Sequence, residues 1–264
     1  MTIPFNLASF SKDYCFRFNQ GADLPCLFLP HCGEFGHRIF SLRFVAWHPA
    51  SHKIVCCRPR EVALYPTADA FDFAWTDPVP DDQRVGSIRN FELHWPRIIE
   101  RYPRHCPIDQ SRLSLEDEIN VLNPNRQLPF HLPTTGRPAV DVVLGYRKRE
   151  YCPQRNWPEE NWAALKAELY SRKITFAQLP TSTAGDCSAA IELLANCRLY
   201  VGTDSGASHL ASEVRCPMLI FRCEDGSRDN IHRMEQVNCD NVERLTKAWN
   251  NPQRVIDRIV ERLK

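Results

Sequence analysis

Residues 200–211 read Tyr200-Val201-Gly202-Thr203-Asp204-Ser205-Gly206-Ala207-Ser208-His209-Leu210-Ala211. The first four residues predict the end of a strand, and residues 207–214 predict a helix that Asp204 or Ser205 can cap. The head of that helix offers N–H groups and a positive dipole end to an anion, and His209 in the first turn leans back to the same place. A pyrophosphate fits all of these groups. For an isolated Asp-Ser-Gly, however, a well-capped helix with a merely packed His209 is the simpler interpretation.

Elements of the same kind surround this segment in the second half of the chain. Short apolar runs predict strands, and the segments between them predict helices; the strands lie at 139–146, 173–179, 198–202 and 217–222, and the helices at 157–171, 188–197 and 207–214. The segment 157–171 opens with a proline and two acids, which are helix-start signals. Strands that alternate with helices across short turns predict an α/β fold with a parallel sheet.

The first half of the chain is interrupted by many prolines. It predicts strands at 24–30 and 52–57 and helices at 37–47 and 88–102, with a further helical segment at 113–122. Four prolines between residues 123 and 138 indicate a linker. We therefore expect an N-terminal domain at 1–125, a linker at 126–137, a C-terminal domain at 138–250 and a final amphipathic helix at 251–264.

Two segments carry a resemblance to a known family. Gly202-Thr203-Asp204-Ser205-Gly206-Ala207-Ser208-His209-Leu210-Ala211 is similar to the donor-binding motif of the heptosyltransferases (glycosyltransferase family 9), which typically reads D-S-G-x-x-H-L-A. Arg155-Asn156-Trp157-Pro158 resembles that family's K-x-W-P segment. The resemblance implies the GT-B fold, in which two Rossmann-like domains with parallel sheets face each other and the C-terminal one mainly holds a nucleotide-sugar.

The resemblance also implies a set of donor-binding residues. The diphosphate would be held by Asp204, Ser205, Gly206 and His209. Arg155 stands where the family has lysine, which keeps the positive charge but changes the donor geometry. Arg147 and Trp157 complete the expected donor-binding set.

The loop after the first predicted strand offers a general base. The family places a glycine followed by an acidic base in this loop, and here Gly33-Glu34 and Gly36-His37 both offer such a pair. Spacing along the helix favours His37 as the positional match, whereas a carboxylate such as Glu34 is the usual base. Either group can take the proton of an acceptor hydroxyl. We expect the catalytic base to be Glu34 or His37, with Gly33 and Gly36 on the acceptor side.

Composition narrows the setting of this chemistry. A net charge of +1 gives no global attraction to nucleic acid, and the N-terminus shows no secretory signal. The 12 cysteines form no C-x-x-C pair, which favours reduced thiols over a zinc site or disulfides and is consistent with the cytoplasm. Because no D-x-D lies in a strand-end loop, we expect a metal-independent reaction with no cofactor besides the nucleotide-sugar donor.

Several functions share these signals. The first is transfer of a sugar to a hydroxyl of a glycan, a lipopolysaccharide or a small acceptor. A second is transfer to hydroxymethylated pyrimidines in DNA, for which arginines between residues 58 and 104 would contact phosphates. A nucleotide-sugar epimerase or a non-catalytic nucleotide-sugar binding protein are further alternatives. The sequence indicates neither the oligomeric state nor the stereochemistry of transfer.

Overall fold

The chain divides into two compact units, Met1–Pro129 and Phe130–Lys264. The computed structural model describes residues 25–29, 39, 42, 45–46, 48, 50–73, 95–109, 137–149, 153–179, 187–223, 231, 234–235, 238 and 241–264. Among these residues, no helix has the length and apolar character needed to cross a bilayer. The proposed linker at 126–137 lies almost wholly outside the described residues.

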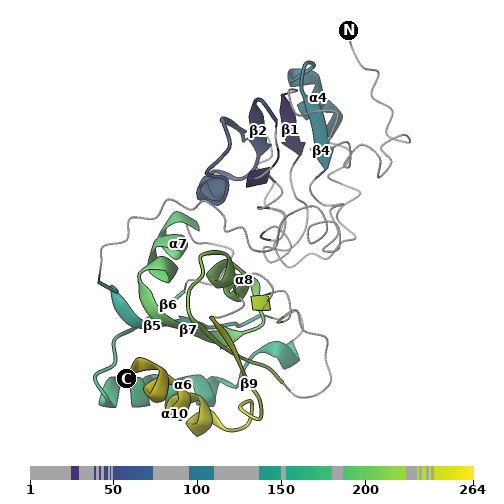
Figure 1. Ribbon diagram of the computed structural model, residues 1–264. Helices are drawn as coiled ribbons and strands as arrows, with labels where there is room; N and C mark the ends of the chain where they lie inside the picture. The colour runs from purple at the N-terminus through teal and green to yellow at the C-terminus, as the bar shows by residue number, and fades with distance from the viewer. Residues whose placement is uncertain are drawn as a thin grey trace. The chain divides into compact units, whose positions relative to one another are not determined.

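The N-terminal unit is built on a four-stranded parallel sheet of order β3-β2-β1-β4 (Figure 1). Its strands are short and come in chain order as β1 Cys26–Leu29, β2 Lys53–Cys56, β3 Ala70–Asp72 and β4 Cys106–Asp109. A 3-10 helix, η2, spans Pro59–Leu64, and helix α4 spans Trp95–Arg101. Leu27, Leu29, Ile54 and Ile98 pack into one apolar cluster, which fastens α4 to the sheet.

The sequence predicts the central strands of this unit but not its outer ones. β1 and β2 fall inside the expected segments 24–30 and 52–57. β3 has three residues and β4 contains Pro107, so neither has the length or the composition that identifies a strand. Of the expected helix at 37–47, the described Ile39, Leu42 and Val45 are helical and buried. The expected helix at 113–122 lies outside the described residues.

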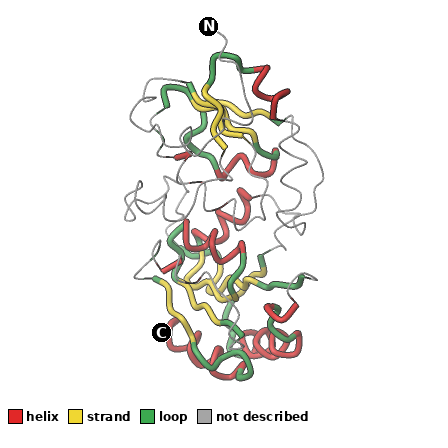
Figure 2. Tube along the Cα trace, turned by 90° about the vertical axis from the view of Figure 1, so that its right-hand side faces the viewer, coloured by secondary structure: helices red, strands yellow, loops and turns green. Residues whose placement is uncertain are grey.

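The C-terminal unit holds a five-stranded parallel sheet of order β6-β5-β7-β8-β9. Its strands are β5 Val140–Gly145, β6 Phe176–Gln178, β7 Cys197–Thr203, β8 Met218–Phe221 and β9 Val242–Leu245. Its α-helices are α6 Glu159–Ser171, α7 Cys187–Ala195, α8 Gly206–Glu213 and α10 Pro252–Leu263. Helices α7 and α8 lie on one face of the sheet, and α6 and α10 lie on the other (Figures 1 and 2). The α/β fold class predicted from the alternation of elements is therefore confirmed.

The helix ends follow local chemistry. Asn251 caps α10 by accepting the Arg254 N–H at 3.2 Å, and Pro252 occupies the first turn, where a missing N–H costs nothing. Pro158 is the N-cap of α6, one position earlier than a first helical residue, and Glu159 and Glu160 favour the helix dipole from the first turn. On α6 itself, Trp162 is fully buried in the core of the unit.

Both sheets contain a point at which the chain reverses its direction of winding. In the C-terminal sheet the chain goes from β5 outward to β6 and then returns to the other side of β5 to form β7. In the N-terminal sheet β2 and β3 lie on one side of β1 and β4 lies on the other. Ligands of open α/β sheets bind beyond the carboxyl ends of the strands at such switch points. The ends of β5 and β7 are therefore the place to look for a site in the C-terminal unit.

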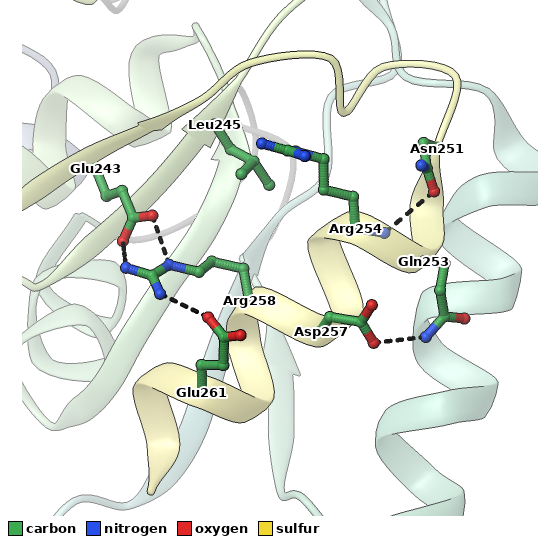
Figure 3. A pocket seen from close by; sticks show the side chains of 8 residues that line it. All are labelled: Glu243, Leu245, Asn251, Gln253, Arg254, Asp257, Arg258 and Glu261. Atoms are coloured by element: carbon green, nitrogen blue, oxygen red, sulfur yellow. Dashed lines mark hydrogen bonds and ion pairs between the residues drawn. The ribbon is translucent and has the colours of Figure 1, made fainter.

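A hollow of about 520 Å³ lies elsewhere in this unit, between β9 and the exposed side of α10 (Figure 3). Its most prominent group, Arg258, is held by both carboxylate oxygens of Glu243 at 2.5 and 2.9 Å and by Glu261 at 2.6 Å. None of the expected site residues lines this hollow. The charges in it serve to fasten the edge strand to the last helix.

Candidate functional site

The head of α8 is fixed by two serines. Ser208 Oγ accepts the Ser205 N–H at 2.8 Å and donates to the Ser205 carbonyl oxygen at 2.7 Å. Ser205 Oγ in turn accepts the Ser208 N–H at 3.4 Å, so each serine caps the other. The N–H groups of Gly206 and Ala207 occupy the first two helical positions, where an α-helix supplies no acceptor of its own. This end of α8 has the geometry of an anion-binding helix head.

Asp204 joins the helix head to two cationic or polar side chains. Arg155 Nη2 donates to Asp204 Oδ2 at 2.7 Å and to the Asp204 carbonyl oxygen at 2.9 Å. His209 Nε2 lies 3.3 Å from the other carboxylate oxygen, and the side chains of Asp204 and His209 are only 5% and 6% exposed. Charge-assisted hydrogen bonds in such a shielded place hold their geometry well. The structure thus brings Arg155, Asp204 and His209 together, as the two sequence motifs suggested.

Arg147 lies in the loop after β5. Its side chain is buried, and Nη1 donates to Oδ1 of Asn156. The same amide accepts the Arg149 N–H at 3.1 Å and donates to the Arg149 carbonyl oxygen at 2.7 Å. Asn156 therefore ties the β5 loop to the segment that carries Arg155. The sequence motifs contained Asn156, but nothing in the sequence assigned it this bridging role.

Trp157 is part of the core rather than of the helix head. Its side chain is 2% exposed, and its ring packs edge-on against Trp162 and Phe221 at centroid distances of 4.9 and 4.7 Å. The indole N–H donates to the Trp249 carbonyl oxygen at 2.7 Å. Trp157 thus anchors the segment in the core of the unit, and Arg155, two residues earlier, reaches the helix head; the expected contact of Trp157 with the donor stays a prediction.

Tyr200 is a further residue at this site to which sequence reasoning gave no role. It lies on β7 below the helix head and is completely buried. Burial raises the pKa of its phenol, an effect that the nearby hydroxyls of Ser205 and Ser208 partly oppose. The signal that could have identified it is the glycine at each strand end, Gly145 and Gly202, which leaves room for a large ring.

The expected catalytic base cannot be placed in the same way. Gly33, Glu34, Gly36 and His37 lie outside the described residues, so their roles stay predictions. The loop that carries them follows β1, which borders the switch point of the N-terminal sheet.

The described residues show no ready metal centre. Among them, no three His, Cys, Asp or Glu side chains come together as metal ligands would. The cation at the helix head is instead the guanidinium of Arg155, beside the positive end of the helix dipole. Such an arrangement can hold a diphosphate and stabilise the charge that it gains when a bond to it breaks.

Comparisons with known proteins bear on the fold. No protein-family model matches the sequence, and no curated protein matches it. Among solved structures, E. coli heptosyltransferase WaaC with ADP is similar, with a TM-score of 0.53 and 14% identity over 90% of this chain and 100% of that one.

Two other solved structures agree with it. The glycosyl transferase family 9 protein of Veillonella parvula has a TM-score of 0.51 and 14% identity, over 76% of this chain and 81% of its own. The dodecameric iron-containing heptosyltransferase TibC in complex with ADP-D-beta-D-heptose has a TM-score of 0.50 and 11% identity, over 92% of this chain and 78% of its own. The chain has two parallel sheets, each with its own switch point, and its fold is the GT-B-like fold of the heptosyltransferases and of glycosyltransferase family 9.

Proposed function

We propose that this chain is a glycosyltransferase that binds a nucleoside-diphosphate sugar at the head of α8 and transfers the sugar to an acceptor hydroxyl. The observation that carries the proposal is the placement of Arg155, Asp204 and His209 around a capped helix head at the switch point of the C-terminal sheet. The solved neighbours that contain ADP or an ADP-heptose support an adenine nucleotide as the first donor to test.

In the proposed reaction, the acceptor oxygen forms a bond to the anomeric carbon while the bond from that carbon to the diphosphate oxygen breaks. The acceptor proton passes to Glu34 or His37, and the nucleoside diphosphate leaves with the electron pair of the broken bond. The N–H groups at the head of α8, with the guanidinium groups of Arg155 and Arg147, would stabilise the leaving phosphates. Asp204 holds Arg155 in place for this task, because its carboxylate and carbonyl oxygens fix one end of the guanidinium.

Metal independence and a cytoplasmic setting are parts of the proposal. Two guanidinium groups and a helix dipole can take over the charge that a divalent ion would neutralise. Because the similar TibC is iron-containing, turnover should be compared before and after treatment with a chelator. The eight described cysteines are all free thiols, as suits a reducing compartment.

Thermal-shift titration with ADP, UDP, GDP and CMP tests donor binding, since a specific ligand stabilises the folded state by mass action. We expect Arg155→Ala to weaken the binding of the preferred nucleotide ~10–100-fold, because a guanidinium–phosphate contact in a shielded site is worth roughly 1.5–3 kcal/mol. Arg101→Ala is the matched control, since Arg101 also pairs with an aspartate, Asp72, but on the N-terminal sheet. No binding by the wild type, or equal binding by Arg155→Ala, would contradict the proposal.

A second assay separates the enzyme classes. The chain is incubated with the sugar donor alone and then with glycan, small-molecule or hydroxymethylated DNA acceptors. A transferase releases nucleoside diphosphate in proportion to a particular acceptor, whereas an epimerase converts the donor without one. A binding protein would do neither, and that result would reduce the proposal to donor binding.

A further inference from the structure

Tyr200 occupies space at the ends of two neighbouring strands. Gly145 on β5 and Gly202 on β7 are direct partners in the sheet, and Tyr200 lies two residues before Gly202 on the same face. A methyl group added to Gly145 would overlap the Tyr200 hydroxyl oxygen, and one added to Gly202 would lie 2.7 Å from it. The phenol ring therefore lies flat across the backbone of both glycines, with its hydroxyl at the carboxyl ends of β5 and β7.

The hydroxyl of Tyr200 lowers the stability of the folded state in this position. It is fully buried and makes no hydrogen bond of normal geometry. A buried hydroxyl without a partner destabilises a fold, whereas phenylalanine would fill the same space without that cost. The position of the ring thus explains why an aromatic residue is present, but it does not explain the hydroxyl.

The helix cap also borders the Tyr200 phenol. The hydroxyls of Ser205 and Ser208 both lie near enough to influence the Tyr200 phenol. The proton of Ser208 is committed to the Ser205 carbonyl oxygen, and Ser205 Oγ lies 3.5 Å from Ser208 Oγ. Ser205 is therefore the cap hydroxyl whose proton can turn toward a ligand at the helix head.

We propose that Tyr200 is a positioning residue for the diphosphate: its hydroxyl lies beneath the cap and donates to Ser205 Oγ when the Ser205 proton turns to a phosphate oxygen. The role rests on the proposed function. A chain of hydroxyls in which each donates to the next is strengthened by mutual polarisation, and it ends here on an anion. The buried hydroxyl thus gains its partner only in the liganded state, and its cost in the free state becomes affinity for the ligand.

Tyr200→Phe tests this role because it removes one oxygen and keeps the ring. We expect the dissociation constants for ADP, UDP and GDP, measured by calorimetry, to rise ~3–10-fold for whichever nucleotide binds, the usual effect of one lost hydrogen bond. Urea unfolding without nucleotide should show unchanged or higher stability. A purely structural role predicts the opposite, lower stability with unchanged affinity. Tyr170→Phe is the matched control, since the Tyr170 side chain on α6 is 82% exposed.

A double-mutant cycle makes the test specific for the serine. In a Ser205→Ala background, Tyr200→Phe should cause no further loss of nucleotide affinity, because the two hydroxyls act through one chain. Additive effects of the two substitutions, or equal affinity of Tyr200→Phe and the wild type, would overturn the proposed role of Tyr200 but leave the proposed function standing. A wild-type chain that binds none of the three nucleotides would overturn the proposed function, and this role with it.

Discussion

Asp72 and Asp204 lie at or just beyond the ends of parallel strands, and each is paired with an arginine. Asp72 ends β3, the edge strand of the N-terminal sheet, and pairs with Arg101 at 3.5 Å. Asp204 follows β7, a central strand at the switch point of the C-terminal sheet, and pairs with Arg155 at 2.7 Å. Both carboxylates are buried, but Arg101 is 55% exposed and Arg155 only 27%.

The partners of the two aspartates differ as much as their positions. Asp72 also accepts a hydrogen bond from the Tyr102 hydroxyl at 2.8 Å, so its two partners lie at the end of α4 and the pair fastens that helix to the sheet. The partners of Asp204 come from the 3-10 helix η5 (Pro153–Arg155), 49 residues away, and from the first turn of α8. An Asp–Arg pair thus stabilises the packing of a helix at the edge of one sheet, and another is a candidate binding element at the switch point of the other sheet. Only the surroundings distinguish the two pairs.

The largest expected difference is in stability after removal of each aspartate. Asp204→Ala leaves the shielded Arg155 and His209 without their shared acceptor and should lower the free energy of unfolding by roughly 3 kcal/mol. Asp72→Ala leaves an arginine that can reach water and should cost about 1–2 kcal/mol. Urea unfolding of both variants measures the difference. Equal losses of unfolding free energy would mean that the two Asp–Arg pairs contribute equally to stability, contrary to this prediction.

A smaller effect tests whether, in the segment 155–157, Trp157 anchors the segment in the core while Arg155 contacts the helix head. Trp157→Phe removes the indole N–H that bonds to the Trp249 carbonyl oxygen and should destabilise the chain by roughly 1–2 kcal/mol, with nucleotide affinity unchanged. Tyr102→Phe removes the corresponding hydroxyl at Asp72 and should cost about 1 kcal/mol. Loss of nucleotide affinity in Trp157→Phe beyond that of Tyr102→Phe would instead support contact of Trp157 with the donor.

The smallest expected effect is chemical and concerns a cysteine pair in each unit. Cys26 and Cys106 are direct partners on β1 and β4, and the hydrogen bond from Cys26 lowers the pKa of Cys106 to about 7. Cys197 and Cys216, with sulfur atoms 3.2 Å apart, are both buried. Because the thiolate is the nucleophile, the rate of alkylation at Cys106 should rise with pH and level off above about 7, ahead of an ordinary thiol.

Peptide mapping after a brief treatment with iodoacetamide follows this reaction, with Cys106→Ser as the control. Cys197 and Cys216 should stay unmodified in the folded chain. Faster modification of the buried pair than of Cys106 would show that the C-terminal unit opens more readily than the N-terminal one.

The contrast between the two sheets also explains what could be predicted from the sequence. The strands and helices from β5 to β8 are apolar runs separated by short turns, so their order and type follow from local pattern. β9 reads Val242-Glu243-Arg244-Leu245 and lies at a sheet edge; two of its four residues are charged, so its apolar pattern is too weak to predict a strand. β3 and β4 were missed for a similar reason, since short strands at sheet edges carry little pattern.

The candidate site divides in the same way. The sequence predicts a cap at Asp204 or Ser205 and His209 in the first turn, because both follow from local helix geometry, and the cap is Ser205. Asn156 bridges to Arg147 and Arg149 in a separate loop, and Trp157 donates to the carbonyl oxygen of Trp249, 92 residues away. A local pattern encodes neither contact. The side-by-side packing of Tyr200 with Gly145 required the register of β5 against β7.

That packing has a consequence for how this protein can change over generations. Gly145, Gly202 and Tyr200 share one volume, so alanine at Gly145 collides with the ring unless a smaller residue has already replaced Tyr200. Replacement of Tyr200 by a smaller residue first leaves a cavity that alanine at Gly145 can then fill, whereas replacement of Gly145 first gives an overpacked intermediate. The three positions should therefore vary together among descendants of this chain, along a path in which the tyrosine is lost before either glycine.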